Sequence, residues 1–109
     1  MNHTVLIVED EEDLREMMRE ALELNGYSVV TASEGTDALA KLADIQSPCL
    51  ILLDLLMPGM NGWDFYENVR KRPELSAVPV IVHSSAPSRA PQGVTRVLQK
   101  PLVLDRLLS

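Results

Sequence analysis

The chain has 109 residues, of which 46% are hydrophobic and 24% charged, and its formal net charge is −6 at pH 7. These values predict one globular domain that spans residues 1–109. The negative charge argues against direct binding to nucleic acid or to an anionic membrane surface, because both attract basic patches. The single cysteine, Cys49, excludes an intrachain disulfide. We see neither a signal peptide nor an apolar run long enough to span a bilayer, so we expect a cytoplasmic protein.

The first predicted element is a short buried strand over residues 4–8, which ends in Glu9 and Asp10. Three more acids follow, and we interpret them as the solvated first turn of a helix, where the helix dipole favours negative charge. Apolar side chains then recur at helical spacing, at Leu14, Met17, Met18, Ala21 and Leu22. Gly26 suits the left-handed position that ends such a helix.

A second strand, with a weaker pattern, is predicted over residues 27–32. Ser33 is the expected N-cap of a second helix. Leu39 and Leu42 mark the inner face of that helix, so the chain alternates strand and helix from its start.

The central strand covers residues 49–53 and is apolar throughout, which is typical of a strand buried on both faces. It ends abruptly in Asp54. The proline and glycines of residues 57–62 then predict a tight loop. An acid at the carboxyl end of a buried parallel strand lies where open α/β sheets bind their ligands. We therefore interpret Asp54 as the reactive group of a site.

A third helix follows the loop, with Asn61 as its expected N-cap. Its apolar stripe consists of Phe65, Tyr66 and Val69. A fourth strand is predicted over residues 78–83, directly before Ser84 and Ser85. Two prolines and a glycine make residues 86–93 a poor helix.

A fifth strand is predicted over residues 95–98, with Lys100 close behind it, and a last helix begins at residue 102. This alternation predicts a doubly wound parallel sheet with helices on both faces. Parallel strands share one carboxyl edge, so we expect one crevice to collect the polar residues that follow the strands. These residues are Glu9, Asp10, Asp54, Ser84 and Lys100.

Three carboxylates in one crevice repel one another, since two unit charges ~4 Å apart cost ~4 kcal/mol at an effective dielectric constant of ~20. Either one acid is protonated or a cation lies among them. Mg²⁺ takes carboxylate and phosphate oxygens, and Mn²⁺ is an alternative. Lys100 supplies a charge that pairs with phosphate, and Ser84 supplies a hydroxyl donor. The set is suited to phosphoryl transfer onto Asp54.

The sequence resembles the receiver domains of two-component response regulators over nearly its whole length. Four motifs carry the resemblance, in the family's order: residues 5–11, residues 53–62, residues 79–85 and the pair Lys100-Pro101. The resemblance implies a flavodoxin-like, five-stranded parallel sheet with strand order 2-1-3-4-5. It also implies a cis peptide bond between Lys100 and Pro101.

The resemblance further implies that Asp54 accepts a phosphoryl group from a histidine kinase or a phosphotransfer protein. The implied ligands of Mg²⁺ are Asp10, Asp54, the Leu56 backbone carbonyl and, through water, Glu9. The implied contacts to the phosphoryl oxygens come from Lys100, Ser84 and the Ser85 backbone amide. Such a protein catalyses only its own phosphorylation and dephosphorylation, and it signals by binding a downstream protein.

The sequence departs from the family at the positions that carry its signal. Lys100 follows Ser84 by only 16 positions, shorter than usual by about one and a half helical turns, so the fourth helix is expected to be shortened or missing. The family's switch positions correspond to Ser84 and to Val97, where the family has an aromatic residue. Leu56 has no side-chain group that orients a water, so we expect slow autodephosphorylation.

Two other functions stay open. A phosphorylation-independent protein-interaction module would keep the fold and bind partners constitutively. A small phosphatase with an aspartyl intermediate would normally carry a second acid at the position of Leu56. We interpret His83 as an ordinary strand-end residue, with a proton shuttle as the alternative. Trp63 and Tyr66 are expected to pack their helix, with a docking patch as the alternative.

Overall fold

The computed structural model describes residues 3–45, 48–57, 59–84 and 89–100. In this part of the chain, strands and helices alternate in the expected order. The elements are β1 Thr4–Val8, α1 Glu12–Leu24, β2 Ser28–Ala32, α2 Gly35–Leu42, β3 Leu50–Asp54, α3 Gly62–Arg70, β4 Val80–Ser84 and β5 Arg96–Gln99. The last predicted helix, Ser85 and the Lys100–Pro101 bond lie outside the described residues. None of the described helices combines the length and apolar character needed to cross a membrane.

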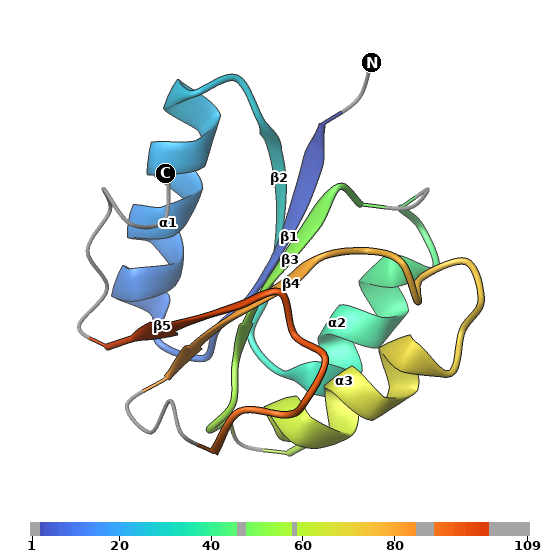
Figure 1. Ribbon diagram of the computed structural model, residues 1–109. Helices are drawn as coiled ribbons and strands as arrows, with labels where there is room; N and C mark the ends of the chain where they lie inside the picture. The colour runs from blue at the N-terminus through green and yellow to red at the C-terminus, as the bar shows by residue number, and fades with distance from the viewer. Residues whose placement is uncertain (1–2, 46–47, 58, 85–88, 101–109) are drawn as a thin grey trace.

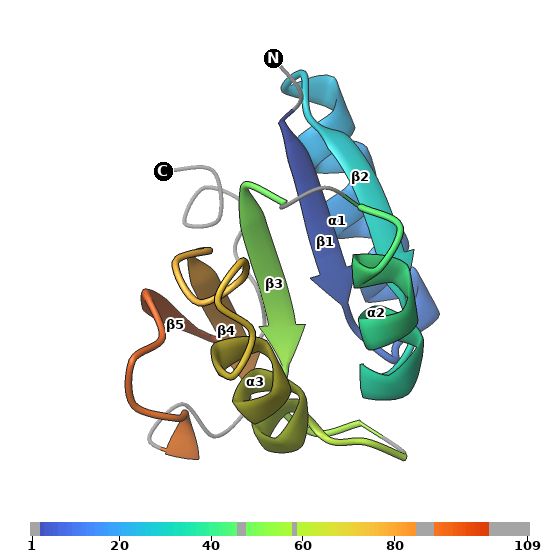
Figure 2. The ribbon, with the colours of Figure 1, turned by 90° about the vertical axis from the view of Figure 1, so that its right-hand side faces the viewer.

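The five strands form one parallel sheet in the order β2-β1-β3-β4-β5, as predicted. Helix α1 covers one face of the sheet, and α2 and α3 cover the other (Figures 1 and 2). β1 is buried along its whole length and β3 nearly so, because both lie inside the sheet with helices above and below. This explains why their sequences are apolar without alternation.

A core lies on each face of the sheet. Between the sheet and the α2–α3 layer, Leu53, Val82 and Phe65 belong to one cluster of buried side chains. On the α1 face, Ile7, Leu52 and Met18 belong to a second. Successive residues of a strand alternate between these faces, so each inner strand contributes side chains to both cores.

The helix starts agree with the sequence in one case and correct it in another. Asn61 caps α3, since its Oδ1 accepts a hydrogen bond from the Asp64 backbone N–H at 2.9 Å. The prediction that Ser33 caps α2 is wrong. Glu34 holds that place, and its carboxylate accepts from the Asp37 N–H at 3.0 Å. The helix therefore begins one residue later than predicted, and the carboxylate of Glu34 satisfies the N3 amide of Asp37 in place of a serine hydroxyl.

The connection between β4 and β5 differs from the other crossovers. No α-helix occurs in its described part, residues 89–95, and this agrees with the expected loss of the fourth helix. The segment lies against α3 instead (Figure 2). There Trp63 Nε1 donates to the Arg89 carbonyl at 2.8 Å, and the Arg89 guanidinium lies 5.4 Å from the centre of the Trp63 ring. Trp63 thus helps to fix this connection, and Tyr66, 5% exposed, packs into the core.

Candidate functional site

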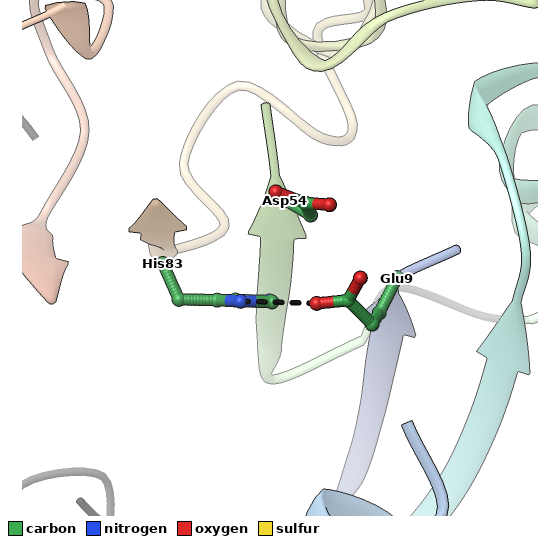
Figure 3. Close-up of side chains that lie close together, drawn as sticks. All are labelled: Glu9, Asp54 and His83. Carbon is green, nitrogen blue, oxygen red and sulfur yellow. Dashed lines mark ion pairs between the residues drawn. The ribbon is translucent and has the colours of Figure 1, made fainter. Parts of the chain in front are cut away.

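The candidate site lies at the carboxyl edge of the sheet, where the three central strands end. Glu9 follows β1, Asp54 is the last residue of β3, and His83 is paired with Asp54 in the register of β3 with β4. All three side chains lie together at this edge (Figure 3). They are buried, with exposed fractions of 0%, 2% and 1% respectively.

Lys100 reaches this cluster from the end of β5. Its Nζ lies 3.1 Å from Glu9 Oε1 and 3.4 Å from Asp54 Oδ1. Its backbone N–H donates to the Ser84 carbonyl at 2.9 Å, which extends the β4–β5 pairing by one bond and fixes where the side chain starts. The convergence expected from the sequence is therefore present for these residues, although 16 positions replace the usual longer crossover.

Burial and neighbouring charge act in opposite directions on the pKa values of Asp54 and Lys100. Loss of solvent raises the pKa of Asp54, and the ammonium of Lys100 opposes that rise. Burial lowers the pKa of Lys100, but the charges of Glu9 and Asp54 outweigh it, and the net pKa of Lys100 is raised. The Leu56 backbone N–H donates to Asp54 Oδ1 at a long 3.4 Å. Asp54 is thus an acid that lacks enough cationic charge nearby.

Glu9 and Asp10 divide their roles by burial. Burial raises the pKa of Glu9 to about 8, and the charge of Asp54 adds to this rise. The Glu11 N–H opposes the rise, because it donates a hydrogen bond to Glu9 Oε2 at 3.1 Å. Asp10 is exposed. Its slight burial acts to raise its pKa, but hydrogen bonding with the carboxyls of Glu9 and Asp54 outweighs this and lowers the pKa of Asp10. At neutral pH, Asp10 carries the negative charge that Glu9 gives up.

The stability of the metal-free protein should fall as the pH rises from 6.5 to 8. Glu9 has a pKa near 4.5 when solvated and about 8 in the fold, so between these values the folded state binds more protons than the unfolded state and stability declines with pH. The pKa of His83 is lowered from 6.5 to about 3, so His83 makes the free energy of unfolding rise with pH, in opposition to Glu9. Most of this rise takes place below pH 6.5 and therefore outside this interval. We expect a loss of about 1–2 kcal/mol in the free energy of unfolding, measured with urea.

Glu9→Gln is the control for this prediction, because the amide keeps the shape of the carboxyl group and does not titrate. The free energy of unfolding of this variant should change little over the same pH interval. An equal decline in both proteins would show that another group causes it.

The sequence interpretation missed the part that His83 plays in the cluster. Its Nδ1 lies 3.4 Å from Glu9 Oε1, across the end of β3 (Figure 3). Burial, followed by the charge of Lys100, lowers the pKa of His83, so the imidazole is neutral. The alternation of side chains along the strands could have indicated this contact. His83 lies on the same face of the sheet as Ile81, and Glu9 lies on the same face as Ile7. Ile81 and Ile7 both belong to the core on the α1 face, so His83 and Glu9 point to the same side.

The other predicted site residues lie around this cluster. Ser84 is 1% exposed, and Leu56, two positions after Asp54 in the loop, is 52% exposed. Val97, at the position of the expected switch aromatic, is 38% exposed. Ser85, the second expected phosphoryl contact, lies outside the described residues.

The donor set fits a divalent cation. One ligand atom from each of Glu9, Asp54 and His83 lies within 4.8 Å of the other two. Glu9 Oε1 is buried and lies in ion-pair range of Lys100, yet it accepts no hydrogen bond of good geometry from the described residues. A cation beside it would offset the burial that raises the pKa values of these acids.

Comparisons with known proteins agree with this geometry. Residues 5–109 match the family described as response regulator receiver domain. Protein PilH of Pseudomonas aeruginosa is 33% identical, with 96% of this chain and 91% of PilH covered. The Bacillus subtilis alkaline phosphatase synthesis transcriptional regulatory protein PhoP is 39% identical over 66% of this chain. The match covers 30% of PhoP, so this chain corresponds to only part of that protein.

Solved structures show the same fold. The Vibrio cholerae chemotaxis protein CheY4 superposes with a TM-score of 0.87 at 30% identity, over 99% of this chain and 94% of its own. The Thermotoga maritima response regulator TrrA, solved in complex with Mg²⁺ and BeF, gives a TM-score of 0.86 at 28% identity, with the same shares of the two chains covered. The chain belongs to the response regulator receiver domain family of two-component signalling systems.

Proposed function

We propose that Asp54 accepts the phosphoryl group and that Lys100 holds it there. The observation that carries the proposal is the approach of Lys100 Nζ to within 3.4 Å of Asp54 Oδ1 at a sheet edge that also holds Glu9. An ammonium in that place pairs with the oxygens of an incoming phosphoryl group. Ser84, at the end of β4, contributes its hydroxyl as a donor, and the Ser85 amide is a further contact in the proposal.

The donor is a phosphohistidine of a histidine kinase or phosphotransfer protein. An Asp54 carboxylate oxygen forms a bond to phosphorus as the bond from phosphorus to the donor's imidazole nitrogen breaks, and the imidazole leaves with the electron pair. Lys100 stabilises the charge on the equatorial phosphoryl oxygens and favours the ionised form of Asp54. The chain thus supplies positioning and charge rather than acid–base chemistry.

Mg²⁺, or Mn²⁺ in its place, would be held by Asp10, Asp54 and the Leu56 backbone carbonyl, with Glu9 acting through water. The bound ion would neutralise charge on the phosphoryl oxygens. Glu9 suits an indirect role, because Lys100, His83 and the Glu11 N–H already lie against its two oxygens.

The proposal treats residues 1–109 as one receiver domain that signals to a downstream protein. Phosphorylation would shift an equilibrium between two conformations of the domain. The size of that shift is limited by the difference in the free energy with which the phosphoryl group interacts with each conformation. The chain would catalyse only its own phosphorylation and dephosphorylation. The cytoplasmic location and the absence of direct nucleic-acid contact stay predictions.

Intact-mass measurement tests the proposal. The protein is incubated with a small acyl phosphate and Mg²⁺, and a parallel sample contains a chelator in place of the ion. We expect the mass of one phosphoryl group to be added only when the ion is present. No added mass with Mg²⁺, or equal labelling with the chelator, would overturn the proposed chemistry.

Autodephosphorylation should be slow, because Leu56, two positions after Asp54, has no side-chain group that positions water. Its side chain is 52% exposed, and its backbone N–H points to Asp54. Leu56→Asn should shorten the phosphoryl half-life by about tenfold or more, since positioned polar groups typically contribute more than this to hydrolysis. Loss of the added mass with time measures the half-life.

Leu24→Asn is the matched control for Leu56→Asn. Leu24 is 88% exposed at the end of α1, so the same exchange there changes the surface without reaching the site. Its half-life should equal that of the wild type. A wild-type half-life of seconds would contradict the prediction directly.

A second function is favoured by one observation. The described part of the β4–β5 connection contains no α-helix and is fixed against α3, and Val97 replaces the switch aromatic. A phosphorylation-independent interaction module would fit this arrangement. Partner capture that is equal for the wild type and for Asp54→Asn would support that function, and capture that depends on Asp54 would exclude it.

A further inference from the structure

Two buried side chains at the sheet edge lack the hydrogen bonds that burial normally demands. His83 is 1% exposed and Glu9 is 0% exposed. Neither ring nitrogen of His83 nor Glu9 Oε1 makes a hydrogen bond within the described residues. Burial without a hydrogen-bond partner destabilises a polar group, so three such atoms in one place require an explanation.

We propose that His83, Glu9 and Asp54 form a site for a transition-metal dication of the Zn²⁺ class. Its ligands would be one imidazole nitrogen and two carboxylate oxygens. This differs from the proposed Mg²⁺ site, which uses only oxygen ligands and includes the exposed Asp10. A neutral imidazole is a preferred ligand of Zn²⁺ and Co²⁺, whereas Mg²⁺ prefers oxygen.

The distances fit a tetrahedral ion. Two donors that each lie about 2.1 Å from a tetrahedral ion are separated by about 3.4 Å. The separation of His83 Nδ1 and Glu9 Oε1 is 3.4 Å. Asp54 has a carboxylate oxygen within 4.8 Å of both, so a modest rotation of that side chain completes three protein ligands. The fourth position would be open to water, as in zinc sites with three protein ligands.

Lys100 competes with the ion for the same oxygens. Its ammonium lies 3.1 Å from Glu9 Oε1 and its side chain is 23% exposed, which makes it the most solvent-accessible of the four side chains. The metal would displace this ammonium toward solvent and take over its ion pairs. Lys100→Met should therefore bind Co²⁺ about tenfold more tightly than the wild type, since it removes a positive charge next to the ion.

Occupancy by such an ion would also regulate the protein. A metal bound to Asp54 and Glu9 would engage the oxygen that attacks phosphorus and move Lys100 away from it. Zn²⁺ would then act as an inhibitor of phosphorylation that competes with Mg²⁺, and this consequence rests on the proposed function of Asp54.

Titration with Co²⁺ tests the site through its visible absorption, which reports nitrogen and oxygen ligands without any phosphoryl transfer. The wild type should bind one equivalent. His83→Leu should bind at least about tenfold more weakly, because the site loses its nitrogen ligand. The control is His3→Gln, which changes the other histidine of the chain, an exposed residue, and should bind like the wild type. Equal binding by His83→Leu, or weak binding by His3→Gln alone, would overturn the proposal.

A measurement on the wild type avoids any dependence on how the variants fold. In nuclear magnetic resonance spectra of the ¹⁵N-labelled protein, Zn²⁺ should shift the ring nitrogens of His83 and leave those of His3 in place. A shift of His3 alone would overturn the site. Phosphorylation with Mg²⁺ is measured in separate samples, so its failure would count against the proposed function while the Co²⁺ and Zn²⁺ results still decide the metal site.

Discussion

The Asp54→Asn protein is expected to gain no phosphoryl group from a small acyl phosphate in the presence of Mg²⁺. The amide oxygen of asparagine is a poor nucleophile and cannot form the acyl phosphate, whereas its size matches the carboxyl group. Intact mass after incubation measures the result, and labelling should fall below detection. Asp64→Asn is the matched control because Asp64 is an exposed acid in the first turn of α3.

The same variant shows whether the loss comes from the site or from the fold. Burial raises the pKa of Asp54, so the folded protein opposes the charge on this side chain. A neutral residue of the same shape should therefore not lower the melting temperature of the metal-free protein at neutral pH. Residual labelling of Asp54→Asn at the wild-type level would assign the phosphoryl group to another residue, such as the exposed Asp10.

Gly62→Ala should destabilise the protein strongly, because the start of α3 leaves no room for a side chain. A Cβ atom at this position would lie 2.5 Å from the Asp54 carbonyl oxygen and 2.6 Å from Leu55 Cα, both of them backbone atoms. The Gly62 N–H also donates to the Leu55 carbonyl at 2.9 Å, so the start of α3 is held against the end of β3. We expect a loss of about 3 kcal/mol in the free energy of unfolding, measured with urea, because backbone must move to relieve the overlap.

Gly26→Ala separates this steric effect from the general cost of replacing a glycine. Gly26 has a φ of +90°, and a Cβ there would meet no atom within 4 Å. Its loss should be about 1–2 kcal/mol, from backbone strain alone. If Gly62→Ala cost no more than Gly26→Ala, the close packing of α3 on Asp54 would be disproved. Any shift that relieves the overlap at Gly62 also moves Asp54, so labelling by the acyl phosphate should fall with stability.

Most of the fold could be predicted because the strands are buried on both faces. Such strands appear in the sequence as apolar runs, and the observed bounds of β1, Thr4–Val8, are those predicted. Each of the other strands differs from the prediction by one or two residues at one or both ends, as for β4, which begins at Val80 rather than at residue 78. Strand ends depend on pairing with neighbours, and local composition does not encode that pairing.

Asp54 and Lys100 could be assigned to one site because each follows a parallel strand, and all parallel strands end at the same edge of the sheet. The cap of α2 could not be assigned in this way. Ser33 and Glu34 both offer an oxygen, and the contact of Gly35 with the Met60 carbonyl, where the backbone N–H donates at 3.3 Å, fixes where the helix begins. That contact joins segments 25 positions apart.

By itself, the sequence determined the alternation of strands and helices, the reactive acid and the edge of the sheet where chemistry is expected, since these follow from local pattern and from the shared direction of parallel strands. Only the tertiary structure decided that His83 faces Glu9 across β3, that Glu9 has a raised pKa, and that the β4–β5 connection packs on Trp63. The physical reason is that burial and electrostatic coupling depend on which side chains the register of three strands brings within a few ångströms. No single segment of the chain carries that information.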